Sequence, residues 1–240
     1  MPSIHELSRS SSFIFSGTVI ERGRSTVPHV PPAGNLVSVR LDRALRVDPV
    51  LGDLRGKTIT VAARAAESLS SGESAVFFTN SWVHGQGIAV REVDHVDIGQ
   101  EADVAAAVAR LPEMHLSDRL STADLVADAE VVEIRPVERT SWDRNYAFWA
   151  AAQLRVNRVL RGQPRQSAVV YFPTAQGPVW WRAPRFEEKQ RGIFILHDSS
   201  RGKTFSEKSL PPGSLVALDP ADFQPESQLQ YLEGLLAGVR

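Results

Sequence analysis

The amino-acid sequence predicts a mainly β protein with flanking helices, organised as two tandem five-stranded barrels that arose by internal duplication. Three segments recur in the same order in the two halves of the chain: residues 12–21 and 124–133, residues 39–46 and 154–161, and residues 75–78 and 192–195. The chain has 240 residues, so each half is large enough to bury a core of its own. We therefore expect a first domain over residues 1–112 and a second over residues 113–240.

In the first copy, short strands are expected to alternate with turns. Residues 4–10 can form a short helix, and residues 13–21 are rich in the aromatic and β-branched residues that favour a strand. The proline-rich residues 23–34 predict an exposed loop. Residues 36–45 follow with a partly alternating apolar pattern, which is typical of a half-buried strand. Three further strands are expected at residues 58–61, 75–79 and 88–93.

A helix is expected to close each copy. Residues 101–111 carry apolar side chains at helical spacing, and Pro112 should end that helix. Leucines at the same spacing predict the closing helix of the second copy at residues 226–237. The other elements expected in the second copy are strands at residues 125–134, 147–160, 168–172, 179–181, 193–197 and 215–218, with a loop at residues 136–145.

The composition narrows the function classes. The chain has a net charge of −1, so it lacks the excess of basic residues that is typical of a dedicated nucleic-acid binder. The chain has no cysteine, which excludes disulfides, thiolate metal sites and iron–sulfur clusters, and favours a reducing compartment. Its N-terminus does not read as a signal peptide, and no apolar stretch is long enough to span a bilayer. We therefore expect a cytoplasmic protein without a membrane span and without a cofactor.

Three phrases of the second copy carry a resemblance to a known fold family. They are Asp124-Leu125-Val126, Val159-Leu160-Arg161-Gly162 and Gly192-Ile193-Phe194-Ile195-Leu196. Together they resemble the oligonucleotide/oligosaccharide-binding (OB) type of barrel, in its netrin-like or tissue-inhibitor-like branch. The resemblance covers most of each copy and implies a fold. Netrin-like inhibitors of metalloproteinases act through an N-terminal cysteine, which this chain lacks, so the resemblance does not imply that activity here.

Two short motifs are similar to part of a phosphate-binding loop. They are Gly56-Lys57-Thr58 and Gly202-Lys203-Thr204. A working loop needs a glycine five positions before the Gly-Lys pair and a helix after it, so that backbone amides wrap the phosphate. Neither motif has that glycine, and Thr58 leads directly into an expected strand. We interpret both motifs as turns.

No arrangement of residues predicts catalysis or metal binding. The six histidines do not occur at metal-ligand spacing, and no Gly-x-Ser-x-Gly elbow is present. Asp94-His95-Val96-Asp97 is the one close acid–imidazole cluster, and it could in principle hold a metal or orient a general base. Neighbouring strand residues point to opposite faces, so a solvated strand end is the better interpretation. We predict that the protein is not an enzyme.

The second copy is unusually rich in aromatic residues with arginines between them. The residues predicted to bind a partner are Trp142, Arg144, Trp149, Trp180, Trp181, Arg182 and Arg185. Trp180 and Trp181 would point to opposite faces of one strand, leaving one of them exposed. Tryptophan and arginine are frequent in protein interfaces, so the sequence favours a non-catalytic binding or assembly module that recognises protein partners, such as a component of a larger complex. Single-stranded nucleic acid or glycan binding through the same aromatics is the alternative, in which rings stack on bases or sugars.

Overall fold

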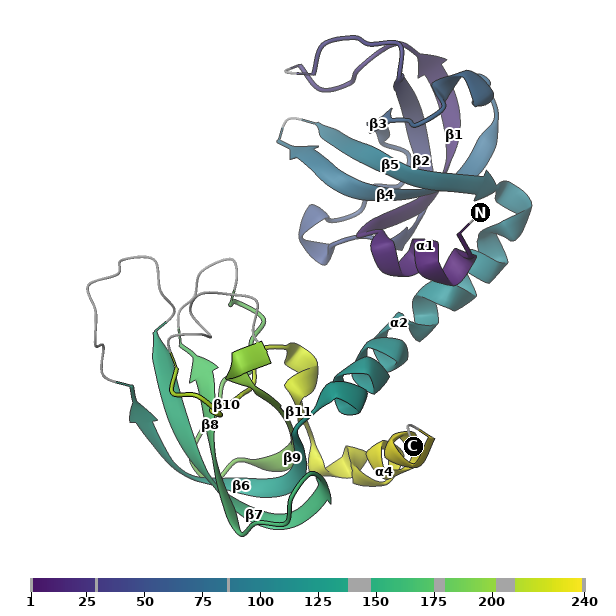
Figure 1. Cartoon of the computed structure of the whole chain (residues 1–240). Coiled ribbons are helices and arrows are strands. Elements are labelled where there is room, and N and C mark those ends of the chain that lie inside the picture. The colour runs from purple at the N-terminus through teal and green to yellow at the C-terminus, as the bar shows by residue number, and fades with distance from the viewer. Residues whose placement is uncertain are drawn as a thin grey trace. The chain divides into compact units, whose positions relative to one another are not determined.

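The computed structural model describes residues 2–28, 30–85, 87–137, 148–174, 180–201 and 210–238. These residues form two compact units, Met1–Pro112 and Glu113–Arg240. Each unit holds one β-barrel with helices beside it (Figure 1).

The first unit is a closed barrel with the strand order β1-β2-β3-β5-β4. Its strands are β1 (Phe13–Arg22), β2 (Leu36–Arg46), β3 (Thr58–Ala62), β4 (Ser74–His84) and β5 (Ile88–Asp97). The pair β3–β5 is parallel, and the other neighbours are antiparallel. The remaining elements are α1 (Ile4–Ser10), η1 (Pro49–Leu51), η2 (Ala66–Ser68) and η3 (Ile98–Gln100). This is the mainly β barrel that the sequence predicts.

Strand β1 shows why this sequence closes into a barrel. The rings of Phe15 and Phe77 stack inside the barrel with centroids 5.2 Å apart. Gly17 lies where β1 passes close to β2, and a Cβ atom there would come within 2.7 Å of the Arg40 carbonyl oxygen. Only glycine fits that approach without a shift of the backbone.

The second unit has the same barrel with one added strand. Its strands are β6 (Leu125–Pro136), β7 (Trp149–Arg161), β8 (Ser167–Pro173), β9 (Arg191–Asp198), β10 (Leu215–Val216) and β11 (Phe223–Gln224). The sheet order is β10-β8-β7-β6-β9-β11, and pairing of β10 with β9 closes five strands into a barrel. The parallel pair is β8–β10. The shorter elements are η4 (Ser199–Arg201), η5 (Pro220–Asp222), η6 (Glu226–Gln228) and α4 (Leu229–Gly238).

The pairing registers of the two barrels agree with the sequence repeat. Gly17 of β1 pairs with Leu41 of β2, and the residues that the repeat places at the same positions, Ala129 and Val156, also pair. All three register shifts of β1 against β2 recur at the matching positions of β6 against β7. The two units therefore share strand order, register and bulges, which is consistent with an OB-like fold for both.

The expected end of a helix at Pro112 is wrong. Helix α2 (Glu101–Thr122) continues through this proline. Val104 and Val108 pack against the first barrel, and Leu116 and Leu120 pack in a core cluster of the second unit. Proline removes one backbone hydrogen bond from a helix interior. The helix persists because good helix formers flank Pro112 and apolar packing holds both halves.

Two arginines of β2 attach the helices to the first barrel. Arg43 Nη1 lies 2.8 Å from Glu101 Oε1 at the start of α2. Arg46 Nη1 donates hydrogen bonds of 2.8 and 2.9 Å to the carbonyl oxygens of Ser8 and Ser11, at the end of α1. A cation at this place satisfies helix-terminal carbonyls and interacts favourably with the helix dipole.

Candidate binding surface

Trp149 begins β7, and its side chain lies in the core. The residue is 8 % exposed. The apolar cluster around it, here called the loop-end cluster, consists of Trp149, Leu210 and Val216 with the partly buried Val137, Tyr171, Trp180 and Leu218. Residues from the β6–β7, β8–β9 and β9–β10 connections thus meet at one place on the second barrel. The Trp149 indole N–H is buried and finds no hydrogen-bond partner among the described residues.

The expected strand over residues 179–181 is wrong where the structure describes it. Trp180, Trp181 and Arg182 form a turn, in which the Ala183 amide donates a 3.1 Å hydrogen bond to the Trp180 carbonyl. Pro184 follows directly, and it has no N–H to donate to a β-ladder. The aromatic character of the segment therefore reflects packing of a loop rather than a strand.

The turn separates the two tryptophans. Trp180 is partly buried, and its ring centroid lies 6.0 Å from that of Trp149. Trp181 is 59 % exposed, and the Arg182 guanidinium carbon lies 4.4 Å from its ring centroid. An exposed indole with a cation on its face is an arrangement that both protein and nucleic-acid interfaces use.

The other predicted binding residues are Arg185, Trp142 and Arg144. Arg185 Nη1 donates a 2.8 Å hydrogen bond to the Pro173 carbonyl, which helps to hold the chain at the end of β8. Trp142 and Arg144 lie outside the described residues, as does most of the expected loop at residues 136–145. Of the predicted set, Trp181 and Arg182 form the exposed pair that the structure describes.

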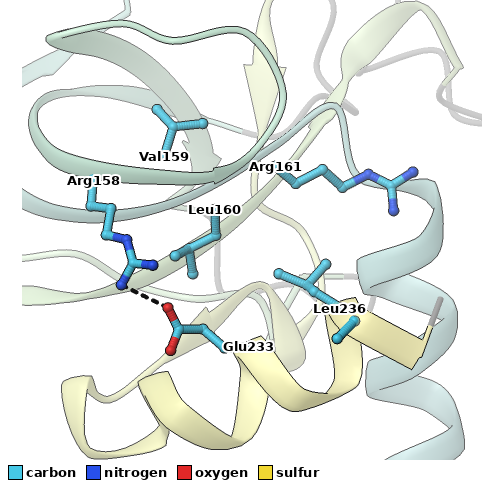
Figure 2. A pocket seen from close by; sticks show the side chains of 7 residues that line it. Arg158, Val159, Leu160, Arg161, Glu233 and Leu236 are labelled. Carbon is cyan, nitrogen blue, oxygen red and sulfur yellow. Dashed lines mark ion pairs between the residues drawn. The ribbon is translucent and has the colours of Figure 1, made fainter. Parts of the chain in front are cut away.

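A cavity of ≈ 490 Å³ lies between β7 and α4 (Figure 2). Its polar groups are already paired: Arg158 lies 2.6 Å from Glu233, and Arg161 Nη1 donates a 3.0 Å hydrogen bond to the Leu120 carbonyl. These arginines repeat the positions and roles of Arg43 and Arg46 in the first unit. Attachment of helices therefore accounts for both arginines without a ligand.

A buried ion pair lies elsewhere in the second unit. Arg119 Nε donates a 2.8 Å hydrogen bond to Asp222 Oδ1, and Arg119 Nη2 donates one of 2.8 Å to Asp222 Oδ2. Asp222 is fully buried. Asp222 also accepts hydrogen bonds from the amides of Leu218 and Asp219. Burial raises the pKa of Asp222, while Arg119 and these amides oppose that rise. No local sequence pattern marks this pair, because the two residues are 103 positions apart.

Two histidines border this ion pair. Burial, helped by the positive charge of Arg119, lowers the pKa of His197 to about 4. Its Nε2 lies 3.7 Å from Asp222 Oδ1, beyond hydrogen-bond distance. His115 Nε2 lies 2.9 Å from Asp219 Oδ1 on the more exposed side. The described part of the chain places no nucleophile in this group, and the group ties α2 to η5.

The acid–imidazole cluster of the first unit has a partner that the motif does not contain. His95 Nδ1 lies 2.7 Å from Oε1 of Glu92, whose side chain is buried. A bulge at Val93 brings residues three apart to the same face. The hydrogen bond to Glu92 raises the pKa of His95, against the opposing effect of burial. His95 of the motif therefore forms a half-buried pair with Glu92 near the end of β5, where we expected a solvated strand end.

The remaining motifs take no part in a site. Gly56 and Lys57 form a turn, with Gly56 at φ 76°, and Thr58 begins β3. The residues 202–204 lie outside the described part of the chain. Within the described residues, no group of three or more His, Asp or Glu side chains is arranged to hold a metal ion. None of the described helices combines the length and apolar character needed to cross a membrane.

Comparison with known proteins assigns no family. No family model matches the chain, and no curated protein matches it. Among solved structures, the chain is similar to a murine DNA binding protein determined with double-stranded DNA, over 85% of this chain and 92% of that chain. The sequence identity is 10% and the TM-score is 0.22. A likeness this low carries no conclusion about ligand or function.

Proposed function

We propose that this protein is a non-catalytic binding module that recognises protein partners through the second barrel. The observation that carries the proposal is the exposed Trp181, stacked with Arg182 beside the loop-end cluster. Large exposed aromatic side chains next to an arginine are the residues that most often dominate protein interfaces.

The residues around Trp181 hold its turn in one conformation, which favours a binding role for this exposed ring. Trp180 and Trp149 are held by packing, and Trp181 extends from the turn that they support. A side chain on a fixed base loses little conformational entropy when it is covered by a partner. The Arg182 guanidinium lies over the exposed Trp181 ring, so aromatic and cationic groups meet at this turn.

The position within the barrel marks the same surface as a place for binding. Barrels of the OB type bind oligonucleotides and oligosaccharides through the loops between strands 1 and 2 and between strands 4 and 5, so this position suits the protein-binding proposal and the alternative below equally. In the second unit these loops are the β6–β7 and β9–β10 connections, and their ends contribute Val137, Trp149 and Leu210 to the loop-end cluster. We also propose that both barrels belong to the netrin-like branch of this fold and that the protein is a component of a larger assembly.

Single-stranded nucleic acid or glycan binding is the alternative for the same surface. Indole rings stack on bases and sugars as well as on protein side chains. The net charge of −1 disfavours nucleic acid, because phosphate contacts require several cations. Binding of a nucleic acid would also weaken strongly as salt is added.

A capture experiment with matched variants tests the proposal. Tagged full-length protein, Trp181→Ala, Arg182→Ala and Tyr231→Ala are used to capture partners from a native lysate, with and without nuclease. Tyr231 is 44 % exposed on α4 of the same unit and serves as the control. We expect nuclease-resistant protein partners that the wild type and Tyr231→Ala retain and the other two variants lose. Partners that all four proteins retain, or that disappear on nuclease treatment, would contradict a protein-binding role for Trp181.

A further inference from the structure

The first barrel has an indole–guanidinium pair of its own. The guanidinium carbon of Arg91 on β5 lies 5.0 Å from the ring centroid of Trp82 on β4. Trp82 is 37 % exposed, and Arg91 is exposed as well. The register of β4 against β5 shifts between Ser81 and Val83, so Trp82 is the extra residue of a bulge. Bulges re-aim side chains and are frequent beside functional surfaces.

The guanidinium of Arg91 keeps its donors available. Its guanidinium lies over the Trp82 ring, and within the described residues it makes no hydrogen bond or ion pair. Stacking on an indole does not use the five N–H donors of a guanidinium. The nearby Arg64 differs, because its Nη1 donates a 3.0 Å hydrogen bond to the Val93 carbonyl.

In the second barrel, the position equivalent to Arg91 is covered by other side chains of the same unit. Val61 of β3 pairs with Val90 of β5, as Val170 of β8 pairs with Leu215 of β10. Val90 and Leu215 both pack toward the interior of their barrels. The next residue in each strand, Arg91 or Val216, therefore lies on the outer face.

This outer position is closed in one barrel and open in the other. In the second unit Val216 is buried under Trp149, at the start of β7, and Leu210, from the β9–β10 connection. In the first unit the loop residue Val27 packs against Ala89 but the face is open two residues further along, at Arg91. In the part of the chain that the structure describes, this open position has an aromatic ring, Trp82, and a cation, Arg91, that makes no hydrogen bond or ion pair.

We propose that the face formed by Trp82 and Arg91 binds an acidic peptide segment of a partner protein. A carboxylate of that segment accepts hydrogen bonds from the Arg91 guanidinium, and an adjacent apolar side chain covers the Trp82 ring. This site is separate from the Trp181 surface, so either can fail without the other.

The charge of the face favours a peptide over a nucleic acid. Among the described residues, this face has one guanidinium without a hydrogen-bond or ion-pair partner, whereas a single strand of nucleic acid is held by a track of several cations. A single bidentate pair between a guanidinium and a carboxylate, with an apolar contact beside it, is enough to orient a short peptide.

Nuclear magnetic resonance of the full-length chain tests the proposal directly. The ¹⁵N-labelled protein is titrated with acetyl-Asp-Glu-Phe-Glu-Asp-amide, and separately with its uncharged counterpart acetyl-Asn-Gln-Phe-Gln-Asn-amide. The signals observed are the indole N–H of Trp82, assigned with Trp82→Phe, and the Nε–H of Arg91. We expect saturable shifts of both signals with the acidic peptide, and much smaller shifts with the uncharged one.

Two variants and one further ligand complete the test. Arg91→Gln should weaken the acidic peptide about tenfold or more, since a hydrogen bond to a charged group is lost. Arg55→Gln makes the same charge change at another exposed residue of the unit and should leave binding unchanged. Absent shifts, equal shifts with both peptides, or unchanged binding by Arg91→Gln would overturn the proposal. Tighter binding of an eight-nucleotide oligo-dT at these signals would overturn it in favour of nucleic acid.

Discussion

At the scale of single residues, the second unit depends on keeping both partners of the ion pair between Arg119 and Asp222. Asp222 is fully buried, and both oxygens accept hydrogen bonds from Arg119. Removing one partner of a buried pair leaves an uncompensated charge, which typically costs about 3–5 kcal/mol. We expect Arg119→Ala to lower the free energy of unfolding of the second unit by about that amount in urea denaturation.

An exposed ion pair provides the control for this prediction. Arg135 and Glu133 form two 2.7 Å hydrogen bonds on the surface of the same unit. Arg135→Ala should not measurably change stability, because solvent screens exposed pairs. Equal effects of the two substitutions would show that the Arg119 pair is not buried as described.

His197 makes the stability of the fold depend on pH. Its pKa is near 6.5 in the unfolded chain and about 4 in the folded protein. Between these values the unfolded chain binds more protons, so stability is full above pH 6.5 and falls as the pH drops toward 4. From pH 7 to pH 5 the wild type should lose about 2 kcal/mol more than His197→Phe, measured by urea unfolding.

His95 supplies a contrast of opposite sign. The Glu92 hydrogen bond raises its pKa, so its contribution is present below pH 6.5 and is lost as the pH rises through the raised value. In a titration followed by imidazole resonances, His95 should protonate above pH 6.5 and His197 well below it. The reverse order would contradict both assignments of environment.

These residue environments show where sequence reasoning reaches its limit. Arg119 and Asp222 meet only after the barrel, α2 and η5 have formed, so no local pattern marks them. Conversely, the prediction that one of Trp180 and Trp181 is exposed is confirmed, although the described residues of that segment form a turn and not the expected strand. A turn separates adjacent side chains as effectively as a strand does.

At the scale of elements, the sequence repeat corresponds to matching strand pairs in the two barrels. Residues 39–46 pair with β1 in the same register as residues 154–161 pair with β6, and the bulges fall at matching positions. The repeat predicts that both copies share one fold. Neither the repeat nor the alternation of apolar residues predicts which strands pair or in what register. The predicted helix end at Pro112 is wrong because apolar packing on both sides of the proline outweighs its local tendency to end a helix.

The proline within α2 leads to a prediction about helix stability. Pro112→Ala restores an amide that can donate to the Val108 carbonyl and removes the clash of the ring. We expect the substitution to stabilise the helix by up to about 3 kcal/mol, seen as slower amide exchange over residues 109–116. Faster exchange or a lower melting temperature would show that the proline is required for the helix as it stands.

At the scale of the whole molecule, each unit has a closed barrel and core clusters of its own. We therefore expect the fragments 1–112 and 113–240 to fold separately, with reduced stability because α2 is divided between them. Circular dichroism and amide exchange of the two fragments measure this. If both fragments were unfolded, the units would depend on each other for folding.

The second barrel's exposed tryptophan is the point at which the proposed function is most directly tested. A photo-crosslinking residue, p-benzoylphenylalanine, placed at Trp181 and separately at the control position Tyr231, reports what contacts each position in cells. The proposal predicts a crosslinked protein partner at position 181 and none at position 231. Crosslinks to nucleic acid, no crosslink at position 181, or the same products at both positions would contradict it.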